Sequence, residues 1–170
     1  MIRELMWSDL DALIENYYSY YEEAKENPDL GISFYHSKPD YQSEIDWFSD
    51  LYKSVKSGDA VAVVAEEDGK AVGLCEARRI RPGTELSHVA TVGISLRKDY
   101  RGRGLGKAMM HLLIDRSRGK FEILRLEVFT VNRAAIDLYR KLGFVEYGMM
   151  PRAIKRGSRY YDELLMYYEI

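Results

Sequence analysis

The sequence predicts an α/β fold in which helices flank a mixed, mostly antiparallel sheet. Segments with apolar residues at helical spacing alternate with β-rich segments, in the order β-α-α-β-β-β-α-β-α-β-β. The middle of the chain holds a strand–helix–strand unit, which requires a right-handed crossover between parallel strands. The connections before and after this unit are short and glycine-rich, and they are typical of hairpins between antiparallel strands.

Length and composition indicate a single domain, which we expect to span residues 1–170. A hydrophobic content of 46% with 31% charged residues is ordinary for a soluble protein. No apolar run reaches the ~18 residues of a membrane span, and the N-terminus lacks the regions of a signal peptide. Cys75 is the only cysteine, which excludes an intrachain disulfide, and the three histidines lack metal-ligand spacing. We therefore expect a cytoplasmic protein with no bound metal and no membrane partner.

The first part of the chain is predicted as a strand followed by two helices. The strand covers Ile2–Leu5, and Ser8 is a plausible N-cap for a helix over residues 9–25 whose apolar stripe repeats every ~3.6 residues. The second helix is expected over residues 43–56, and Gly58 ends it. The segment between the helices contains proline, glycine and scattered aromatic residues, which indicates a loop.

Strands dominate the next part of the chain. Ala60–Ala65 and Lys70–Arg79 flank the dipeptide Asp68-Gly69, which favours a tight hairpin turn. The β-rich run His88–Leu96 leads directly into a glycine-rich stretch. The remaining elements are predicted as a helix over residues 105–118, a strand over 123–131, a helix over 132–142 and two strands over 144–154 and 158–170.

The glycine-rich stretch is Arg101-Gly102-Arg103-Gly104-Leu105-Gly106-Lys107, at the start of the predicted helix over residues 105–118. Glycine at alternate positions lets the backbone turn sharply, so that several N–H groups can face one anion. The helix N-terminus adds partial positive charge, and the three cationic side chains add full charges. This combination predicts a binding site for a phosphate or pyrophosphate.

Two common phosphate-binding loops do not fit this stretch. A P-loop has four residues between its first glycine and a Gly-Lys-Ser/Thr, whereas three residues separate Gly102 from Gly106, and Ala108 follows the lysine. A Rossmann fingerprint that began at Gly102 would need glycine or alanine where the chain has Lys107.

Two sequence blocks carry a resemblance to a known family. Arg101, Gly104 and Gly106 match Arg/Gln-x-x-Gly-x-Gly/Ala, and the segment from Asn132 to Phe144 matches Asn-x-x-Ala-x-x-Leu-Tyr-x-x-x-Gly-Phe. Both blocks, at this separation, resemble the GCN5-related N-acetyltransferase (GNAT) superfamily. The resemblance implies the acyl-CoA N-acyltransferase (GNAT) fold, acetyl-CoA (coenzyme A) as the bound cofactor, and the transfer of an acetyl group to an amine.

The resemblance also implies residues on the cofactor side of the site. Tyr139 would give a proton to the departing thiolate, since a phenol of pKa ~10 can assist a thiolate of pKa ~8.5; the alternative is a core tyrosine on an apolar helix stripe. Asn132 would cap its helix and contact the cofactor. The backbone of Ile94, Ser95 and Leu96 would line a gap between splayed strands, where the pantetheine arm lies like an added strand.

Glu127 is the candidate general base by resemblance. A carboxylate in the middle of a buried strand needs a partner, so the alternative is an ion pair with Arg125 or another cation. Some relatives instead place a carboxylate on the strand before the glycine loop, where this chain has Thr91. Glu76 and His88 are the second choices for the base.

The acceptor is indicated only by charge. Residues 1–50 carry 3 Lys/Arg and 12 Asp/Glu, which is −9, so the remainder carries +7 of the total −2. The two oppositely charged parts of the chain are either two solvated faces, or the acidic part faces a cationic acceptor. In the second case the expected carboxylates are Glu22, Glu23, Glu26 and Asp29. We expect a small-molecule amine, such as a polyamine, or a protein N-terminal or lysine amine.

Nucleic acid is not an expected partner because the net charge is negative and no nucleic-acid-binding motif is present, and a homodimer is left open. The alternative function is a non-catalytic acyl-CoA-binding module.

Overall fold

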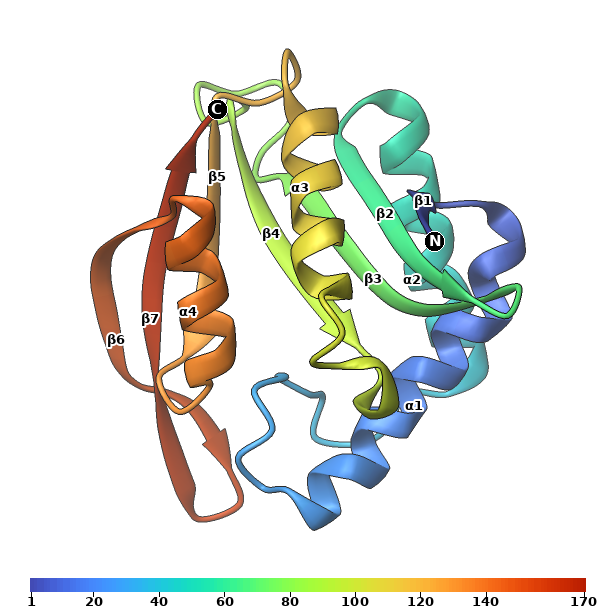
Figure 1. Cartoon of the computed structure of the whole chain (residues 1–170), viewed down its shortest axis with the longest axis vertical. Coiled ribbons are helices and arrows are strands. Elements are labelled where there is room, and N and C mark those ends of the chain that lie inside the picture. Colours follow the sequence, from blue (N-terminus) through green and yellow to red (C-terminus); the bar gives the residue numbers. More distant parts are fainter.

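Seven strands form one mixed sheet with α-helices on both faces in the computed structural model, which describes residues 1–170 (Figure 1). The strand order is β1-β2-β3-β4-β5-β7-β6, and all neighbours are antiparallel except β4 and β5, which are parallel. This arrangement confirms the predicted fold class. The elements are β1 (Ile2–Glu4), η1 (Trp7–Asp9), α1 (Leu10–Glu26), α2 (Tyr41–Ser57), β2 (Ala60–Glu67), β3 (Lys70–Arg79), β4 (Val89–Leu96), η2 (Lys98–Tyr100), α3 (Leu105–Ser117), β5 (Ile123–Phe129), α4 (Arg133–Leu142), β6 (Val145–Arg156) and β7 (Arg159–Glu169).

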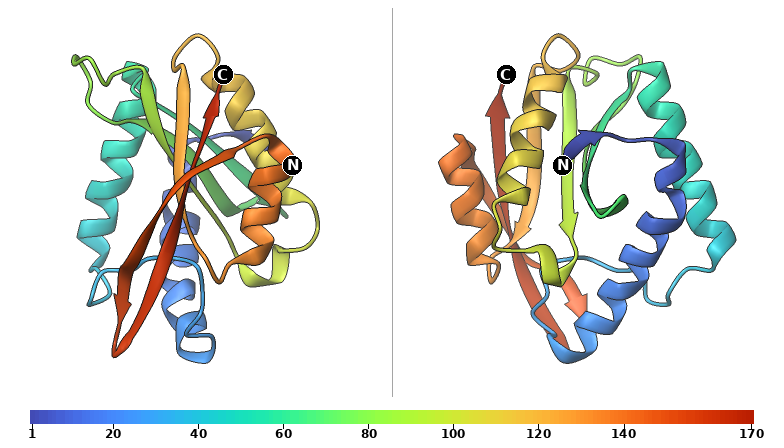
Figure 2. Two further views of the ribbon diagram at one scale, coloured as in Figure 1. Left: turned by 90° about the vertical axis from the view of Figure 1, so that its left-hand side faces the viewer. Right: turned by 45° about the vertical axis from the view of Figure 1, so that its right-hand side comes forward.

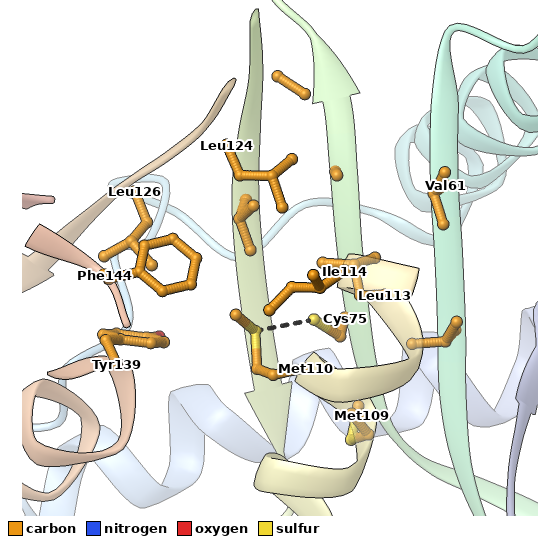
Figure 3. Packing of buried hydrophobic residues seen from close by; sticks show 14 of the residues in the cluster. Val61, Cys75, Met109, Met110, Leu113, Ile114, Leu124, Leu126, Tyr139 and Phe144 are labelled. Carbon is orange, nitrogen blue, oxygen red and sulfur yellow. Dashed lines mark hydrogen bonds between the residues drawn. The ribbon is translucent and has the colours of Figure 1, made fainter. Parts of the chain in front are cut away.

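The helices form a layer on each side of the sheet (Figure 2). Strand β2 is apolar on both faces, so both faces of the sheet must be covered by helices. Its residues Val61 and Val63 belong to the larger core, which packs under α3 and α4 (Figure 3), whereas Ala62 and Val64 belong to a smaller core under α1 and α2. The helices are amphipathic or short, and none has both the length and the apolar character needed to cross a bilayer.

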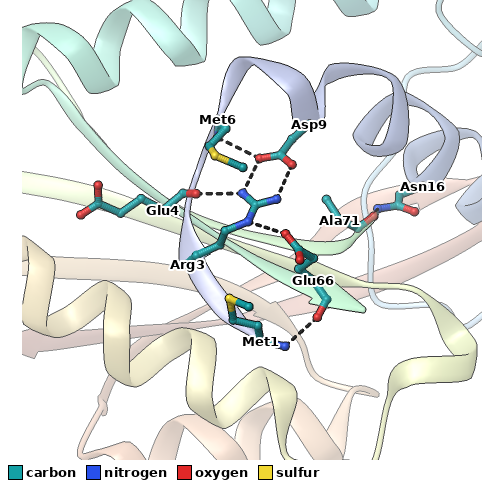
Figure 4. Close-up of polar contacts among 8 residues, drawn as sticks. All are labelled: Met1, Arg3, Glu4, Met6, Asp9, Asn16, Glu66 and Ala71. Atoms are coloured by element: carbon teal, nitrogen blue, oxygen red, sulfur yellow. Dashed lines mark hydrogen bonds and ion pairs between the residues drawn. The ribbon is translucent and has the colours of Figure 1, made fainter. Parts of the chain in front are cut away.

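The start of α1 differs from the prediction. Ser8 does not cap this helix, because a 3₁₀ turn (η1) precedes it and Asp9 occupies the N-cap position. The Asp9 carboxylate accepts a hydrogen bond from the Met6 N–H at 2.8 Å and pairs with Arg3 through both oxygens (Figure 4). Arg3 also donates to Glu66 at 2.6 Å. A partly buried ionic cluster, which includes Glu66 from a distant segment, therefore sets this helix start.

The second helix begins two residues earlier than predicted. Its N-cap is Asp40, whose side chain accepts a hydrogen bond from the Ser43 N–H at 2.8 Å. Ser43 is therefore inside the helix and not at its start. Gly58 ends the helix in the left-handed conformation, with φ of +84°, as predicted.

Candidate active site

The parallel strands β4 and β5 separate as β4 approaches the glycine-rich stretch. They pair only over Val89–Thr91 and Ile123–Arg125, and beyond this point β4 pairs with β3 alone. A cleft of about 740 Å³ lies between the separated strands, and the loop after α1 and the start of α4 form its other walls. The gap expected from the resemblance is therefore present, and Ile94, Ser95 and Leu96 line it.

The glycine-rich stretch over residues 101–107 joins η2 to α3 beside this cleft. Gly102 and Gly104 have φ of +73° and +81°, in the left-handed region that favours glycine. A Cβ atom at either position would meet no other atom within 4 Å, so both face open space. Gly106 lies in the first turn of α3, where a Cβ atom would be 3.7 Å from the Leu138 side chain of α4. Leu105, half-buried, packs against the larger core.

The three cations of this stretch have different positions. The Arg101 guanidinium pairs with both oxygens of buried Glu23 at 2.5 and 2.8 Å, and its Nε donates to the Leu96 carbonyl at 2.7 Å. Arg101 therefore joins α1 to the end of β4, and its charge is already neutralised. This corrects the expectation of three free cations. Arg103, over the Tyr100 ring at 5.3 Å, and Lys107 are exposed.

Tyr139 comes from α4 and lies on the wall of the cleft. Its ring is 6% exposed and packs against Phe144, with a centroid distance of 5.8 Å (Figure 3). Burial, with a contribution from nearby Cys75, raises the pKa of the Tyr139 phenol above its ordinary value of ~10. The side chain is thus both a core residue and a protonated group at the cleft.

Asn132 connects three parts of the site. Its side-chain oxygen accepts a hydrogen bond from the Ala135 N–H at 3.2 Å, so it caps α4 as predicted. The same side chain lines the cleft and contacts the loop after α1 at Gly31. A Cβ atom on Gly31 would lie 2.5 Å from the Asn132 Nδ2 atom, so only glycine permits this approach.

Glu127 is on β5 and is exposed in the cleft. It forms no ion pair, because Arg125 instead donates to the Thr91 hydroxyl at 3.3 Å. The alternative of an ion pair with Arg125 is therefore wrong, because the gap beside β5 exposes Glu127 to the cleft.

A second carboxylate, Glu163 on β7, was missed from the sequence. Glu163 is opposite Phe129 in the β5–β7 ladder and Glu127 is opposite Leu165, so both carboxylates lie on one face of the sheet. Burial and the charge of Glu127 raise the pKa of Glu163. The sequence feature that could have identified Glu163 is a carboxylate within an apolar strand, which is the same feature that identified Glu127.

The two second choices for the base do not lie in the cleft. His88 is at the opposite end of β4, where a ring nitrogen is 3.1 Å from the Glu85 carbonyl oxygen. Glu76 is on β3 and accepts a hydrogen bond from Arg78 at 3.3 Å. Neither side chain is among those that line the cleft, although Glu76 lies beside Gly93, which does.

Arg156, at the end of β6, holds the loop after α1 against the C-terminal hairpin. Its guanidinium donates to the backbone carbonyls of Leu30 at 3.0 Å and Ile32 at 2.6 Å, and also to that of Pro28. Tyr161 on β7 donates to the same Pro28 carbonyl at 3.0 Å. Figures 1 and 2 show this loop crossing below the gap toward the hairpin. Arg156 therefore fixes one wall of the cleft.

Replacing Arg156 with lysine should loosen this wall. One ammonium group cannot reproduce a planar guanidinium that binds several carbonyls, and each hydrogen bond to a charged group contributes ~1.5–3 kcal/mol. We expect faster hydrogen exchange at the amides of residues 28–34, measured by mass spectrometry. Arg152→Lys, exposed on the same hairpin with its guanidinium over the Tyr160 ring and not bonded to the loop, is the control. Unchanged protection in Arg156→Lys would show that the loop is held by its own packing.

The four carboxylates expected at an acceptor entrance are all paired. Their partners are Lys25 for Glu22, Arg101 for Glu23, Lys98 for Glu26 and Arg159 for Asp29. Of the four, only Asp29 lines the cleft. The local negative charge is therefore largely compensated.

Comparisons with known proteins agree with this geometry. The model of the acetyltransferase (GNAT) family matches residues 10–144. The L-methionine sulfoximine/L-methionine sulfone acetyltransferase of Pseudomonas aeruginosa is 27% identical over 71% of this chain and 69% of its own. The ribosomal-protein-alanine N-acetyltransferase of Brucella melitensis superposes with a TM-score of 0.83 at 27% identity, covering 100% of this chain and 99% of its own.

A further solved structure shares the fold. The yncA protein of Salmonella typhimurium, whose structure includes its cofactor acetyl-CoA, has a TM-score of 0.83 at 22% identity and covers 99% of this chain and 92% of its own. The family match spans most of the chain and includes both sequence blocks and all the residues that line the cleft except Glu163. The chain therefore belongs to the acetyltransferase (GNAT) family, whose members are acyltransferases with acetyl-CoA as the donor.

Proposed function

We propose that this protein transfers the acetyl group of acetyl-CoA directly to a primary amine in a ternary complex. The observation that carries the proposal is the gap between β4 and β5, which has a phenol on one side and carboxylates on the other. Tyr139 packs with Leu126 and Val128 in the larger core, and Glu127, between them on the strand, faces the opposite side of the sheet. Acid and base thus stand on opposite sides of one cleft.

The glycine-rich stretch is suited to the pyrophosphate of the donor. Gly102 and Gly104 leave open space, the N-terminus of α3 supplies N–H groups and partial positive charge, and Arg103 and Lys107 are exposed cations. Arg101 holds this loop in place through Glu23. Acetyl-CoA would supply the activated acetyl group.

The unpaired edge of β4 is suited to the pantetheine arm. Ile94 and Leu96 direct backbone groups toward the gap, where the arm can pair with them as an added strand and one N–H can polarise the thioester oxygen; the backbone of Ser95 pairs with β3, so Ser95 would take part only through its side chain. Asn132, across the cleft, would contact the cofactor through the side-chain atoms that do not cap α4.

A matched pair of glycine substitutions tests the loop. Gly104→Val places a branched side chain where the phosphates would lie, and Gly58→Val introduces the same strain at the end of α2, far from the cleft. The two glycines have φ of +81° and +84°, and a Cβ atom would meet nothing within 4 Å at either. We expect both to lower the free energy of unfolding by ~1–2 kcal/mol. Only Gly104→Val should also weaken acetyl-CoA binding, by at least ~10-fold in calorimetry; equal affinities in the two variants would remove the loop assignment.

The chemistry follows from the side chains around the gap. The acceptor enters as an ammonium and must lose a proton before attack, and Glu127 or Glu163 accepts it directly or through water. The free amine nitrogen then forms a bond to the acetyl carbon while the carbon–sulfur bond breaks. Tyr139 gives its proton to the departing thiolate. Holding both reactants in one cleft supplies much of the acceleration.

The acceptor class follows in part from the relatives. Their names specify methionine sulfoximine, amino acids and a ribosomal-protein alanine, so both small-molecule and protein amines belong in the test. The experiment is a panel of monoamines, diamines, amino acids and peptides with free N-termini, with release of the coenzyme A thiol as the measurement. Thiol release with at least one amine supports the proposal. Binding of acetyl-CoA without release for any amine would indicate a non-catalytic acyl-CoA-binding module.

A further inference from the structure

A second, smaller pocket lies on the α1 and α2 side of the sheet. Its volume is about 80 Å³, and its walls include the rings of Tyr17, Tyr20, Tyr35 and Trp47. Ser95, which lines the large cleft, also lines this pocket, so the two cavities are neighbours across one residue of β4.

The pocket contains a carboxylate without a partner. Glu44 of α2 is 5% exposed and forms no ion pair or hydrogen bond with another side chain. Burial raises the pKa of Glu44; burial and the hydrogen bond with Tyr21 raise the pKa of Tyr17 on α1, to which the charge of Glu44 makes a smaller contribution. The Ser43 N–H in the first turn of α2 does not donate a hydrogen bond to the Glu44 carboxylate, because it donates to Asp40. A buried carboxylate with no counter-charge destabilises a fold, and such groups are normally paired.

Two more polar atoms at this pocket lack hydrogen-bond partners. The Asn16 side chain is 3% exposed, and its amide nitrogen donates to the Ala71 carbonyl at 2.9 Å (Figure 4), but its Oδ1 atom is unpaired. The hydroxyl of Tyr20, which is 2% exposed, lies near the Ser95 side chain but forms no hydrogen bond of ordinary length. Both oxygens lie just beneath the pocket wall and add partial negative charge beside the carboxylate of Glu44.

We propose that this pocket binds a second cationic group of the acceptor, an ammonium or small alkylammonium, while the primary amine of the same molecule reaches the cleft past Ser95. This inference rests on the proposed acetyl transfer for its biological meaning. The carboxylate of Glu44 supplies the counter-charge, and the four aromatic side chains in the lining can add cation–π attraction.

Size and surrounding charge limit the ligand. A volume of about 80 Å³ is a few times the ~30 Å³ share of one water molecule, which suits a compact alkylammonium group. Among the four rings, only Trp47 already has a cationic side chain over it, Arg78 at 5.7 Å. Arg78 is itself paired with Glu76 and Asp50, so its charge opposes a bound cation only weakly.

A matched pair of probes tests the pocket without acetyl transfer. Choline carries a compact cation and no amine that can be acetylated, and 3,3-dimethylbutan-1-ol is its neutral isostere. We expect NMR titration of the whole protein to give choline at least ~10-fold higher affinity than the isostere. Choline should also inhibit acetylation of a diamine competitively with respect to the diamine.

Substitutions locate the binding. Glu44→Gln should weaken choline binding at least ~10-fold and keep or raise the thermal stability, because it removes a buried charge that lacks a partner. Glu22→Gln, in an exposed pair with Lys25, is the control and should leave choline affinity unchanged. Equal affinity for choline and its isostere, no binding of choline, or choline affinity that Glu44→Gln does not change would each overturn the inference. The amine panel tests the proposed function separately, since Glu44-dependent choline binding does not require turnover.

Discussion

Replacing Tyr139 with phenylalanine is expected to lower kcat by ~10²- to 10⁴-fold and to leave acetyl-CoA affinity close to that of the native protein. The ring would still pack against Phe144, so only the hydroxyl is lost. Because burial raises the pKa of the phenol, Tyr139 is protonated throughout the neutral range, so its hydroxyl is always available to donate a hydrogen bond or a proton to the departing thiolate. Steady-state kinetics with a saturating amine and calorimetry with acetyl-CoA measure the two quantities.

A matched control separates this role from packing. Tyr168 contacts the same Phe144 ring, at a centroid distance of 5.3 Å, but does not line the cleft. Tyr168→Phe should therefore leave kcat near the native value. The Tyr139 substitution should lower the kcat–pH profile at every pH and leave its shape between pH ~6 and ~9 unchanged, because the phenol does not titrate there. Full turnover in Tyr139→Phe would mean that water assists the thiolate and that Tyr139 is only a core residue.

Local features of the site could be predicted from the sequence. The two left-handed glycines and the start of α3 follow from glycine spacing before an apolar helical stripe. Asn132 as the cap of α4 and Gly143 as its end follow in the same way. Such features depend on residues within a few positions of one another, which periodicity and capping rules describe.

Contacts between distant segments could not be predicted. Arg101 and Glu23 are 78 positions apart, and Arg156 and the Leu30 carbonyl are 126 apart, so no spacing rule connects either pair. The exposure of Glu127 depends on strand separation, a property of the folded sheet. Glu163 becomes a candidate only when register places it on the same face.

Glu163 is the stronger candidate for the general base, and Glu163→Gln should lower kcat/KM for the amine by ~10²- to 10⁴-fold. It is half-buried beside the cleft, and its raised pKa makes it a better proton acceptor than an ordinary carboxylate. Asp162→Asn, at the neighbouring position on β7, is the matched control because it does not line the cleft. A Glu163→Gln variant with native kcat/KM would leave Glu127 or water as the base.

Glu127→Gln then distinguishes the two carboxylates through pH dependence. If Glu163 is the base, kcat/KM falls as pH drops through its pKa, which burial and the negative charge of Glu127 both raise. Removing the Glu127 charge takes away one of these causes, so the acidic limb of the kcat/KM–pH profile should move to lower pH while the plateau remains. If Glu127 is the base, the same substitution should instead lower the plateau by ~10²- to 10⁴-fold. A lowered kcat/KM plateau in Glu127→Gln together with a native plateau in Glu163→Gln would make Glu127 the general base instead of Glu163. The reason is that loss of the proton acceptor lowers kcat/KM at every pH, whereas loss of a neighbouring charge only shifts the pH at which kcat/KM falls.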